Sequence, residues 1–218
     1  MMNTYVDWPT QRHRKFGEHI LDICSAHGIG LLLKGSIANG TAKFYSDIDV
    51  SLYGDISKNT IENILFGFEN PLMINVSEKP PGLLVVAYRR GLSIDLAIMQ
   101  NETLDENSET LVLLAPSKPG HSVSDSAQVY MQTIGKNDKY SKISKLIHKG
   151  LLKYMNGKAD AARGFIKEVI EFADIPTNDQ PPVDAFKRMA RTFIREDDAI
   201  MEEFLWLIEE AGKIAPHD

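Results

Sequence analysis

Two aspartates separated by one residue, Asp47 and Asp49, lie in an apolar stretch that is typical of a β-strand. Side chains two positions apart on a strand point to the same face, and aspartate is depleted in strands. Two carboxylates held close together repel each other unless a cation neutralises them. Mg²⁺ is the natural candidate, because it favours carboxylate oxygens together with substrate phosphate. The alternative interpretation is the solvated polar face of an edge strand.

A third aspartate, Asp95, stands alone in a later apolar stretch, residues 92–99. Its neighbours on the same strand face would be Ser93 and Ala97, which are small and leave room for a ligand. Taken alone, Asp95 is typical of a surface aspartate. Together with the Asp-x-Asp pair and the glycine turn before that pair, it favours a metal site.

The glycine turn runs from Gly35 to Gly40. Glycine-rich turns bind phosphate because their backbone N–H groups can converge without hindrance from Cβ. The G-x-x-x-x-G spacing is that of a Walker A loop, but Thr41 and Ala42 follow where that loop needs lysine and then serine or threonine. The sequence therefore excludes a P-loop, and the charge of a bound phosphate would have to be met by a metal ion.

Two kinds of pattern divide the chain. Helical spacing at 9–27 and 59–68 is interspersed with short apolar runs that are typical of strands. These runs lie at 28–36, 46–54, 72–77, 83–90, 92–99 and 111–116. Later residues show amphipathic helical patterns without strand-like alternation. We therefore expect an α+β fold with a mixed β-sheet domain and flanking helices at 1–115, a linker at 116–140 and a C-terminal α-helical bundle at 141–218.

Residues 30–98 resemble the nucleotidyltransferase superfamily, which includes DNA polymerase beta and the antibiotic nucleotidyltransferases. The resemblance rests on Gly35-Ser36, ten further residues and then Asp47-Ile-Asp49-Val50, together with the hydrophobic run 31–33 and Asp95 on a later strand. The size, the acidity and the helical second half are similar to the small antibiotic-modifying enzymes. The implied fold is a nucleotidyltransferase-type mixed sheet followed by a helical substrate-binding domain.

The same resemblance implies roles for the three aspartates and the glycine turn. Asp47 and Asp49 would hold one or two Mg²⁺ ions that bridge a nucleoside triphosphate. Asp95 would hold the catalytic metal near the acceptor hydroxyl, while Gly35-Ser36 would contact the β- and γ-phosphates. The general base is either Asp95 or a carboxylate of the second domain.

Four further residues have two interpretations each. Ser46 either adds a hydroxyl contact to the nucleotide or caps the start of a strand. Lys145 and Lys149 belong to a lysine stripe that is either a solvated helix face or, as in related enzymes, the source of a lysine that reaches the triphosphate. Asp197 falls at an apolar position of the last helical segment, where it would either pair internally, for instance with Arg163, or bind a substrate ammonium.

Composition limits the partners and the location. The chain has 218 residues and a formal net charge of −6, which disfavours general nucleic-acid binding and suits a cationic small molecule. The single cysteine, Cys24, excludes an intramolecular disulfide and favours a reducing compartment. No run approaches the ~20 apolar residues of a membrane span, and the N-terminal residues carry no signal-peptide pattern. We expect a cytoplasmic protein without a membrane segment, and a homodimer is compatible with these properties.

The expected function is Mg²⁺-dependent transfer of a nucleoside monophosphate, AMP from ATP in the first instance, to a hydroxyl of a small acceptor with release of pyrophosphate. An aminoglycoside- or lincosamide-like antibiotic is the leading acceptor. One alternative is a nucleotidyltransferase of the toxin–antitoxin type that modifies a protein or a tRNA. The other is a nucleotide-binding protein without catalytic activity.

Overall fold

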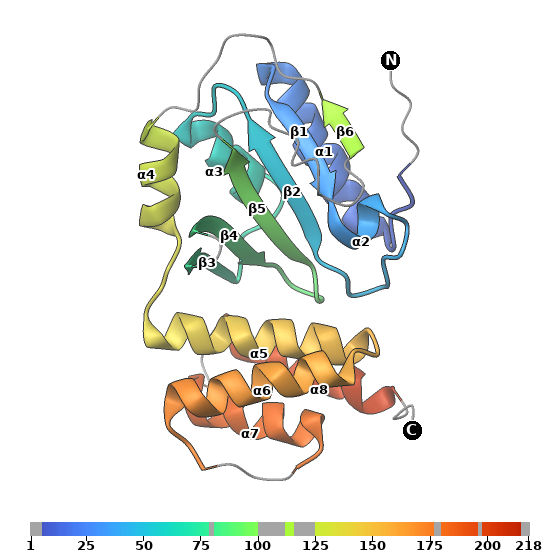
Figure 1. The fold of residues 1–218 in the computed structure, drawn as a ribbon, viewed down its shortest axis with the longest axis vertical. Helices are drawn as coiled ribbons and strands as arrows, with labels where there is room; N and C mark the ends of the chain where they lie inside the picture. The colour runs from blue at the N-terminus through green and yellow to red at the C-terminus, as the bar shows by residue number, and fades with distance from the viewer. Residues whose placement is uncertain are drawn as a thin grey trace. The chain divides into compact units, whose positions relative to one another are not determined.

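The chain passes between two structural units at residues 88–89, 91–92 and 136–137 of this computed structural model (Figure 1). The first unit comprises Met1–Tyr88 and Leu92–Lys136, and the second comprises Arg89–Gly91 and Asn137–Asp218. The structure describes residues 6–78, 81–99, 112–115, 125–176, 180–195 and 198–214.

A six-stranded mixed sheet forms the centre of the first unit, with the strand order β3-β4-β5-β2-β1-β6. The strands are β1 (Gly30–Lys34), β2 (Ile48–Tyr53), β3 (Met73–Glu78), β4 (Pro81–Ala87), β5 (Ser93–Met99) and β6 (Val112–Ala115). The central pair β2 and β5 is parallel, and the other neighbouring pairs are antiparallel. The prediction of an α+β fold with a mixed sheet is confirmed at this level.

In the described part of the first unit there are four helices: α1 (Gln11–His27), α2 (Gly35–Ala38), α3 (Lys58–Phe66) and α4 (Asp125–Ile134). Helix α1 begins after Thr10, whose hydroxyl accepts a hydrogen bond from the backbone N–H of His13, and ends at Gly28, which adopts a left-handed φ of 65°. Both termini therefore follow common capping rules.

Helix α4 lies within the interval 116–140, where the sequence indicated a linker. Lys136, which follows this helix, exchanges two backbone hydrogen bonds with β3: its N–H donates to Ile74 (2.9 Å), and its carbonyl accepts from Val76 (3.2 Å). These bonds extend the first unit to Lys136, and helix α5 of the second unit begins at Lys139.

The hydrophobic core of the first unit lies on one face of the sheet. Along β2 the alternate residues Ile48, Val50 and Leu52 are at most 2% exposed and pack in this core. Helices α1 and α3 contribute further buried side chains: Phe16, Ile20, Cys24, Ile61, Ile64 and Leu65. Because strand side chains alternate, the other alternate residues of β2, among them Asp49 and Ser51, lie on the opposite face of the sheet.

The described residues of the second unit form four helices: α5 (Lys139–Met155), α6 (Ala159–Ala173), α7 (Pro182–Phe193) and α8 (Ala199–Lys213). Asp138 and Asp198 cap α5 and α8 by accepting hydrogen bonds from backbone N–H groups of the first turn. Gly150 allows α5 to approach α7 closely, since a Cβ at this position would lie 2.3 Å from the Phe186 ring. The expected C-terminal helical region is confirmed.

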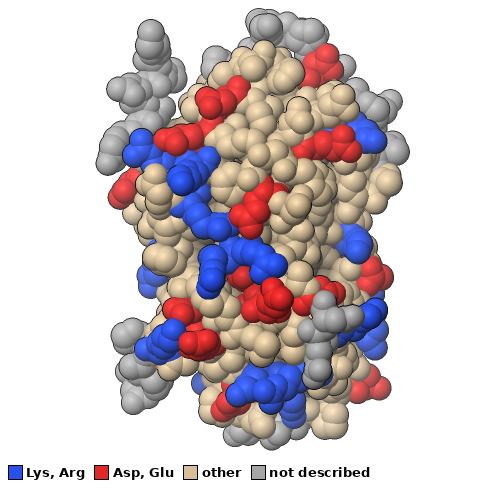
Figure 2. All heavy atoms as spheres, turned by 180° about the vertical axis from the view of Figure 1, so that it is seen from behind, with Lys and Arg blue, Asp and Glu red and all other residues tan. Residues whose placement is uncertain are grey.

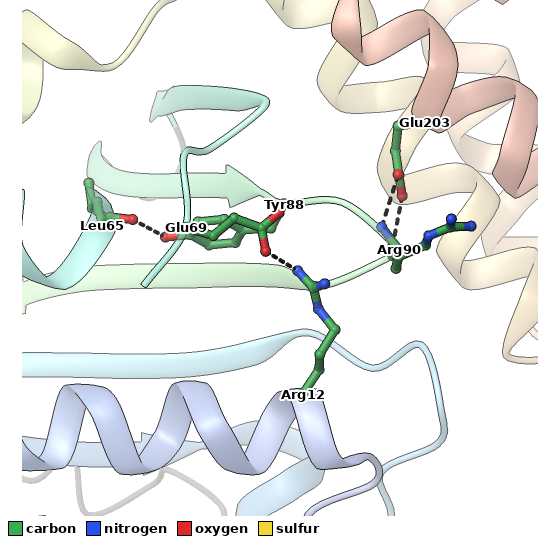
Figure 3. A network of polar contacts seen from close by, with 7 residues as sticks. Arg12, Leu65, Glu69, Tyr88, Arg90 and Glu203 are labelled. Atoms are coloured by element: carbon green, nitrogen blue, oxygen red, sulfur yellow. Dashed lines mark hydrogen bonds and ion pairs between the residues drawn. The ribbon is translucent and has the colours of Figure 1, made fainter. Parts of the chain in front are cut away.

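The turn between β4 and β5, Arg89–Gly91, belongs to the second unit and is held by α8 (Figure 3). Glu203, which is only 3% exposed, accepts hydrogen bonds from the backbone N–H groups of Arg90 (2.9 Å) and Gly91 (2.8 Å). The guanidinium of Arg90 lies over the Trp206 ring, 4.9 Å from its centroid. A buried carboxylate thus satisfies two consecutive N–H groups of a tight turn.

Tyr88 is the last residue of the first unit before this turn. It is fully buried, and its hydroxyl donates a 2.8 Å hydrogen bond to the carbonyl of Leu65 at the end of α3 (Figure 3). Its backbone N–H donates to the carbonyl of Leu92, which closes the hairpin. β5, the strand that carries Asp95, therefore starts directly after a turn whose flanking residues Tyr88 and Leu92 are hydrogen-bonded to each other.

The surface carries charges of both signs. In the face shown in Figure 2, acidic side chains lie beside lysine and arginine side chains. Binding to a nucleic-acid backbone relies instead on clustered positive charge. No helix within the described ranges is long and apolar enough to cross a membrane.

Candidate active site

Asp49 and Asp95 lie side by side on the two central strands. The register of the parallel pair β2 and β5 places Asp49 directly opposite Asp95, and neighbouring strands are about 4.8 Å apart. Both side chains are half-buried and lie on the sheet face opposite the hydrophobic core. The sheet therefore concentrates two negative charges where a cation would be strongly attracted.

Asp47 immediately precedes β2, which begins at Ile48 and not at residue 46 as the sequence pattern predicted, so of the paired aspartates only Asp49 lies within the strand. Asp47 is 8% exposed. The segment before it is closed by Ser46, whose hydroxyl accepts a 2.9 Å hydrogen bond from the backbone N–H of Lys43 and whose own N–H donates to the Lys43 carbonyl at 3.0 Å. In this structure the Ser46 hydroxyl thus fixes the loop that leads into β2.

His13 of α1 is hydrogen-bonded to the same loop. Its Nε2–H donates a 2.9 Å hydrogen bond to the Ser46 carbonyl, and its Nδ1 accepts from the Thr10 hydroxyl at 2.6 Å. Burial lowers the pKa of His13 below its ordinary value of 6.5, although the Ser46 carbonyl and the charge of Asp47 act in the opposite direction. A neutral imidazole with a defined tautomer therefore supports the backbone beside Asp47. The sequence assigned no role to this histidine.

Gly35 brings the backbone of the glycine turn close to the carboxylate of Asp49. It has a φ of 63°, and a Cβ built on it would lie 2.3 Å from Oδ2 of Asp49. Any side chain at this position would collide with that carboxylate. Gly35 is exposed and Ser36 is half-buried at the start of the single-turn helix α2. Their role as a phosphate turn stays a prediction.

The structure therefore places several of the predicted residues around Asp49. Gly35 approaches its carboxylate and Ser36 follows Gly35 in the chain. Asp95 is paired with Asp49 across the sheet, and Asp47 lies just before the start of β2. The structure also adds Lys34, which the register of the antiparallel pair β1 and β2 places opposite Asp49. The sequence signal for Lys34 was its position two residues after Leu32 on an expected strand, which puts it on the face opposite the core residues Leu31 and Leu33.

The lysines predicted to reach the triphosphate belong to α5 of the second unit. Lys145 is half-buried and Lys149 is only 7% exposed. Asp197, predicted either to pair internally or to bind a substrate ammonium, lies outside the described residues. These three assignments stay predictions.

Two adjacent carboxylates suit Mg²⁺ in particular. Among the described residues, no group of three or more His, Cys, Asp or Glu side chains is arranged to hold a metal ion. Mg²⁺ is commonly bound through one or two carboxylates, with water and substrate phosphate completing the coordination, instead of by a complete protein cage. Asp49 and Asp95, with Asp47 two residues before Asp49, fit this kind of shared site.

Searches with known family models and among curated proteins gave no match to this chain. The functional interpretation therefore rests on the residues and on the geometry described above.

Proposed function

We propose that the chain is a Mg²⁺-dependent nucleotidyltransferase that transfers a nucleoside monophosphate, AMP from ATP in the first instance, to a hydroxyl of a small acceptor. The single observation that carries the proposal is the pairing of Asp49 with Asp95 across two parallel strands, with the Gly35 backbone in contact with the Asp49 carboxylate. A phosphate turn and a divalent-metal site in direct contact are what a nucleoside triphosphate bound as its magnesium complex requires.

Asp47, Asp49 and Asp95 would hold one or two Mg²⁺ ions. Oxygen atoms of the substrate phosphates would supply further ligands. When bound, Mg²⁺ supplies positive charge that polarises the α-phosphate and neutralises the leaving pyrophosphate. Gly35 and Ser36 would orient the β- and γ-phosphates through their backbone N–H groups and the Ser36 hydroxyl. This arrangement fixes the α-phosphorus for attack from the side opposite the leaving group.

The acceptor hydroxyl oxygen would form a bond to the α-phosphorus while the bond from that phosphorus to the bridging oxygen breaks. The electron pair of the broken bond leaves with pyrophosphate. The proton of the acceptor hydroxyl would pass to Asp95, the carboxylate on the later strand. The net charge of −6 favours an acceptor that carries amino groups, such as an aminoglycoside-like antibiotic.

A transfer assay tests this proposal. The protein is incubated with Mg²⁺, labelled ATP and a panel of amino-antibiotics, and pyrophosphate is measured with and without each acceptor. The proposal predicts acceptor-dependent pyrophosphate release that disappears when EDTA removes Mg²⁺. Pyrophosphate release without a small acceptor, with label on protein or RNA, would indicate a macromolecular target, and nucleotide binding without transfer would indicate a non-catalytic protein.

A further inference from the structure

Lys34 extends the row of paired residues to a third strand. The register places Lys34 of β1 opposite Asp49 of β2, and Asp49 opposite Asp95 of β5. Residues that lie directly opposite each other on neighbouring strands share one face of the sheet. A positive side chain therefore stands on the same face as the two carboxylates, and the chain continues from it directly into Gly35.

The ammonium of Lys34 is not used by the neighbouring aspartate. Its only hydrogen-bond acceptor within the described part of the chain is Sδ of Met99, at 3.8 Å. A thioether sulfur is a weak acceptor, whereas an ammonium has three N–H donors. The Lys34 side chain is half-buried, so its charge is only partly solvated. Its donors are available to an anion that binds on this face of the sheet.

We propose that Lys34 binds the phosphates of the nucleoside triphosphate, in place of the lysine that the glycine turn lacks. This inference rests on the proposed function and names one further residue of the same site. The turn has Thr41 and Ala42 where a Walker A loop has its lysine, and a triphosphate near Asp49 and Asp95 would be repelled by them. The flexible four-carbon stem of Lys34 allows its ammonium to leave Met99 and pair with a phosphate oxygen.

The rival role for Lys34 is structural, in which its ammonium positions the carboxylates of Asp49 and Asp95 for the metal ion. The two roles predict opposite responses to a divalent ion alone. A lysine that binds phosphate repels the metal weakly, so its loss leaves the affinity for Mn²⁺ unchanged or raised. A lysine that organises the carboxylates is needed for the metal site itself, so its loss lowers that affinity.

The test uses Lys34→Met, which keeps most of the side-chain volume and removes the charge, with Lys34→Arg as the charge-restoring variant. The matched control is Lys15→Gln, an exposed lysine on α1. The probes are Mn²⁺ alone, ATP with Mg²⁺, and inorganic tripolyphosphate with Mg²⁺, each followed by calorimetric titration. Loss of one charged hydrogen-bonded contact should weaken ATP and tripolyphosphate binding by about ten- to a hundredfold in Lys34→Met. Affinity for Mn²⁺ should not fall.

Lys34→Arg should recover most of the affinity for both phosphate ligands, and Lys15→Gln should match the wild type. Unchanged ATP and tripolyphosphate binding in Lys34→Met would overturn the inference while the proposed function stands. An equal loss of Mn²⁺ and ATP binding would assign Lys34 to the carboxylate site and would also overturn it. Failure of the wild type to bind Mn²⁺, ATP or tripolyphosphate would contradict the inference together with the proposed function.

Discussion

Replacing Gly35 by alanine tests whether the glycine turn and the proposed metal site are one unit. Gly35 has a φ of 63° and its added Cβ would lie 2.3 Å from Oδ2 of Asp49. Gly40, at the other end of the same turn, has a φ of 72° but no atom within 4 Å of an added Cβ. The two substitutions therefore share the backbone strain and differ in the collision with Asp49.

The strain of a non-glycine residue in the left-handed region costs about 1–2 kcal/mol. Both variants should lose this amount of unfolding free energy, and each kcal/mol corresponds to about 2–4 °C in Tm for a chain of this size. In Gly35→Ala the carboxylate of Asp49 must also retreat by about 1 Å to reach an ordinary C···O separation of about 3.3 Å. Since the carboxylate can move by rotation of its side chain, this displacement should affect ligand binding more than stability.

The assay is calorimetric titration of Mn²⁺ into wild type, Gly35→Ala and Gly40→Ala, with Tm recorded for each. We expect Gly35→Ala to bind Mn²⁺ about tenfold more weakly or worse, as is typical when a ligand is moved out of position. Gly40→Ala should bind it as the wild type does, at a similar cost in Tm. Equal Mn²⁺ affinities in the two variants would refute the reasoning, because they would show that the position of the Asp49 carboxylate does not govern metal binding at the proposed site.

Three further predictions concern the supporting structure. Glu203→Ala leaves the backbone N–H groups of Arg90 and Gly91 without their buried acceptor, so denaturant unfolding should show that the free energy of unfolding falls by about 3–5 kcal/mol. The control Glu202→Ala removes an exposed ion pair and should cost less than about 1 kcal/mol. Equal losses in the two variants would contradict the role of Glu203. The pKa of His13 is lowered from 6.5 by burial, so the unfolded chain binds more protons and the free energy of unfolding should fall as the pH drops below that value. Urea unfolding should therefore give a steeper pH dependence of this free energy for the wild type than for His13→Asn. Parallel pH profiles of the two proteins would argue against a lowered pKa of His13. Burial raises the pKa of the Cys24 thiol to about 12, so a thiol reagent at about pH 8 should label it only after unfolding, whereas rapid labelling of the native protein would be inconsistent with this burial.

Much of the first unit follows from sequence pattern, but the neighbours within its sheet do not. Apolar runs and alternation indicated the strands that carry Asp49 and Asp95 and the faces on which those side chains lie. Alternation does not say which strands are adjacent, and β3 and β4 intervene in the sequence between β2 and β5. The direct pairing of the two aspartates is therefore a tertiary result, as is the Lys34 row.

Contacts between segments that are distant in the sequence could not be predicted either, because they too depend on the tertiary fold. The hydrogen bond from His13 to Ser46 joins residues that are 33 positions apart, and no local motif marks His13 as a support for Asp47. In the second half, the sequence pattern singled out Asp197 as a carboxylate on an apolar helix face. Within the described part of α8 the buried carboxylate is Glu203, whose partners are backbone N–H groups of a turn more than a hundred residues earlier and therefore have no signature in local sequence.

The most direct test of the central claim is the magnesium dependence of ATP binding in wild type and in Asp49→Asn. Asparagine keeps the size of the side chain and removes the charge that a divalent ion needs. If Asp49 and Asp95 form a metal site for a nucleoside triphosphate, the wild type will bind ATP only with Mg²⁺ present. Asp49→Asn will then bind it at least about tenfold more weakly while its Tm stays near the wild-type value. Equal ATP affinity with and without Mg²⁺, or equal affinity in the two proteins, would contradict the proposed site.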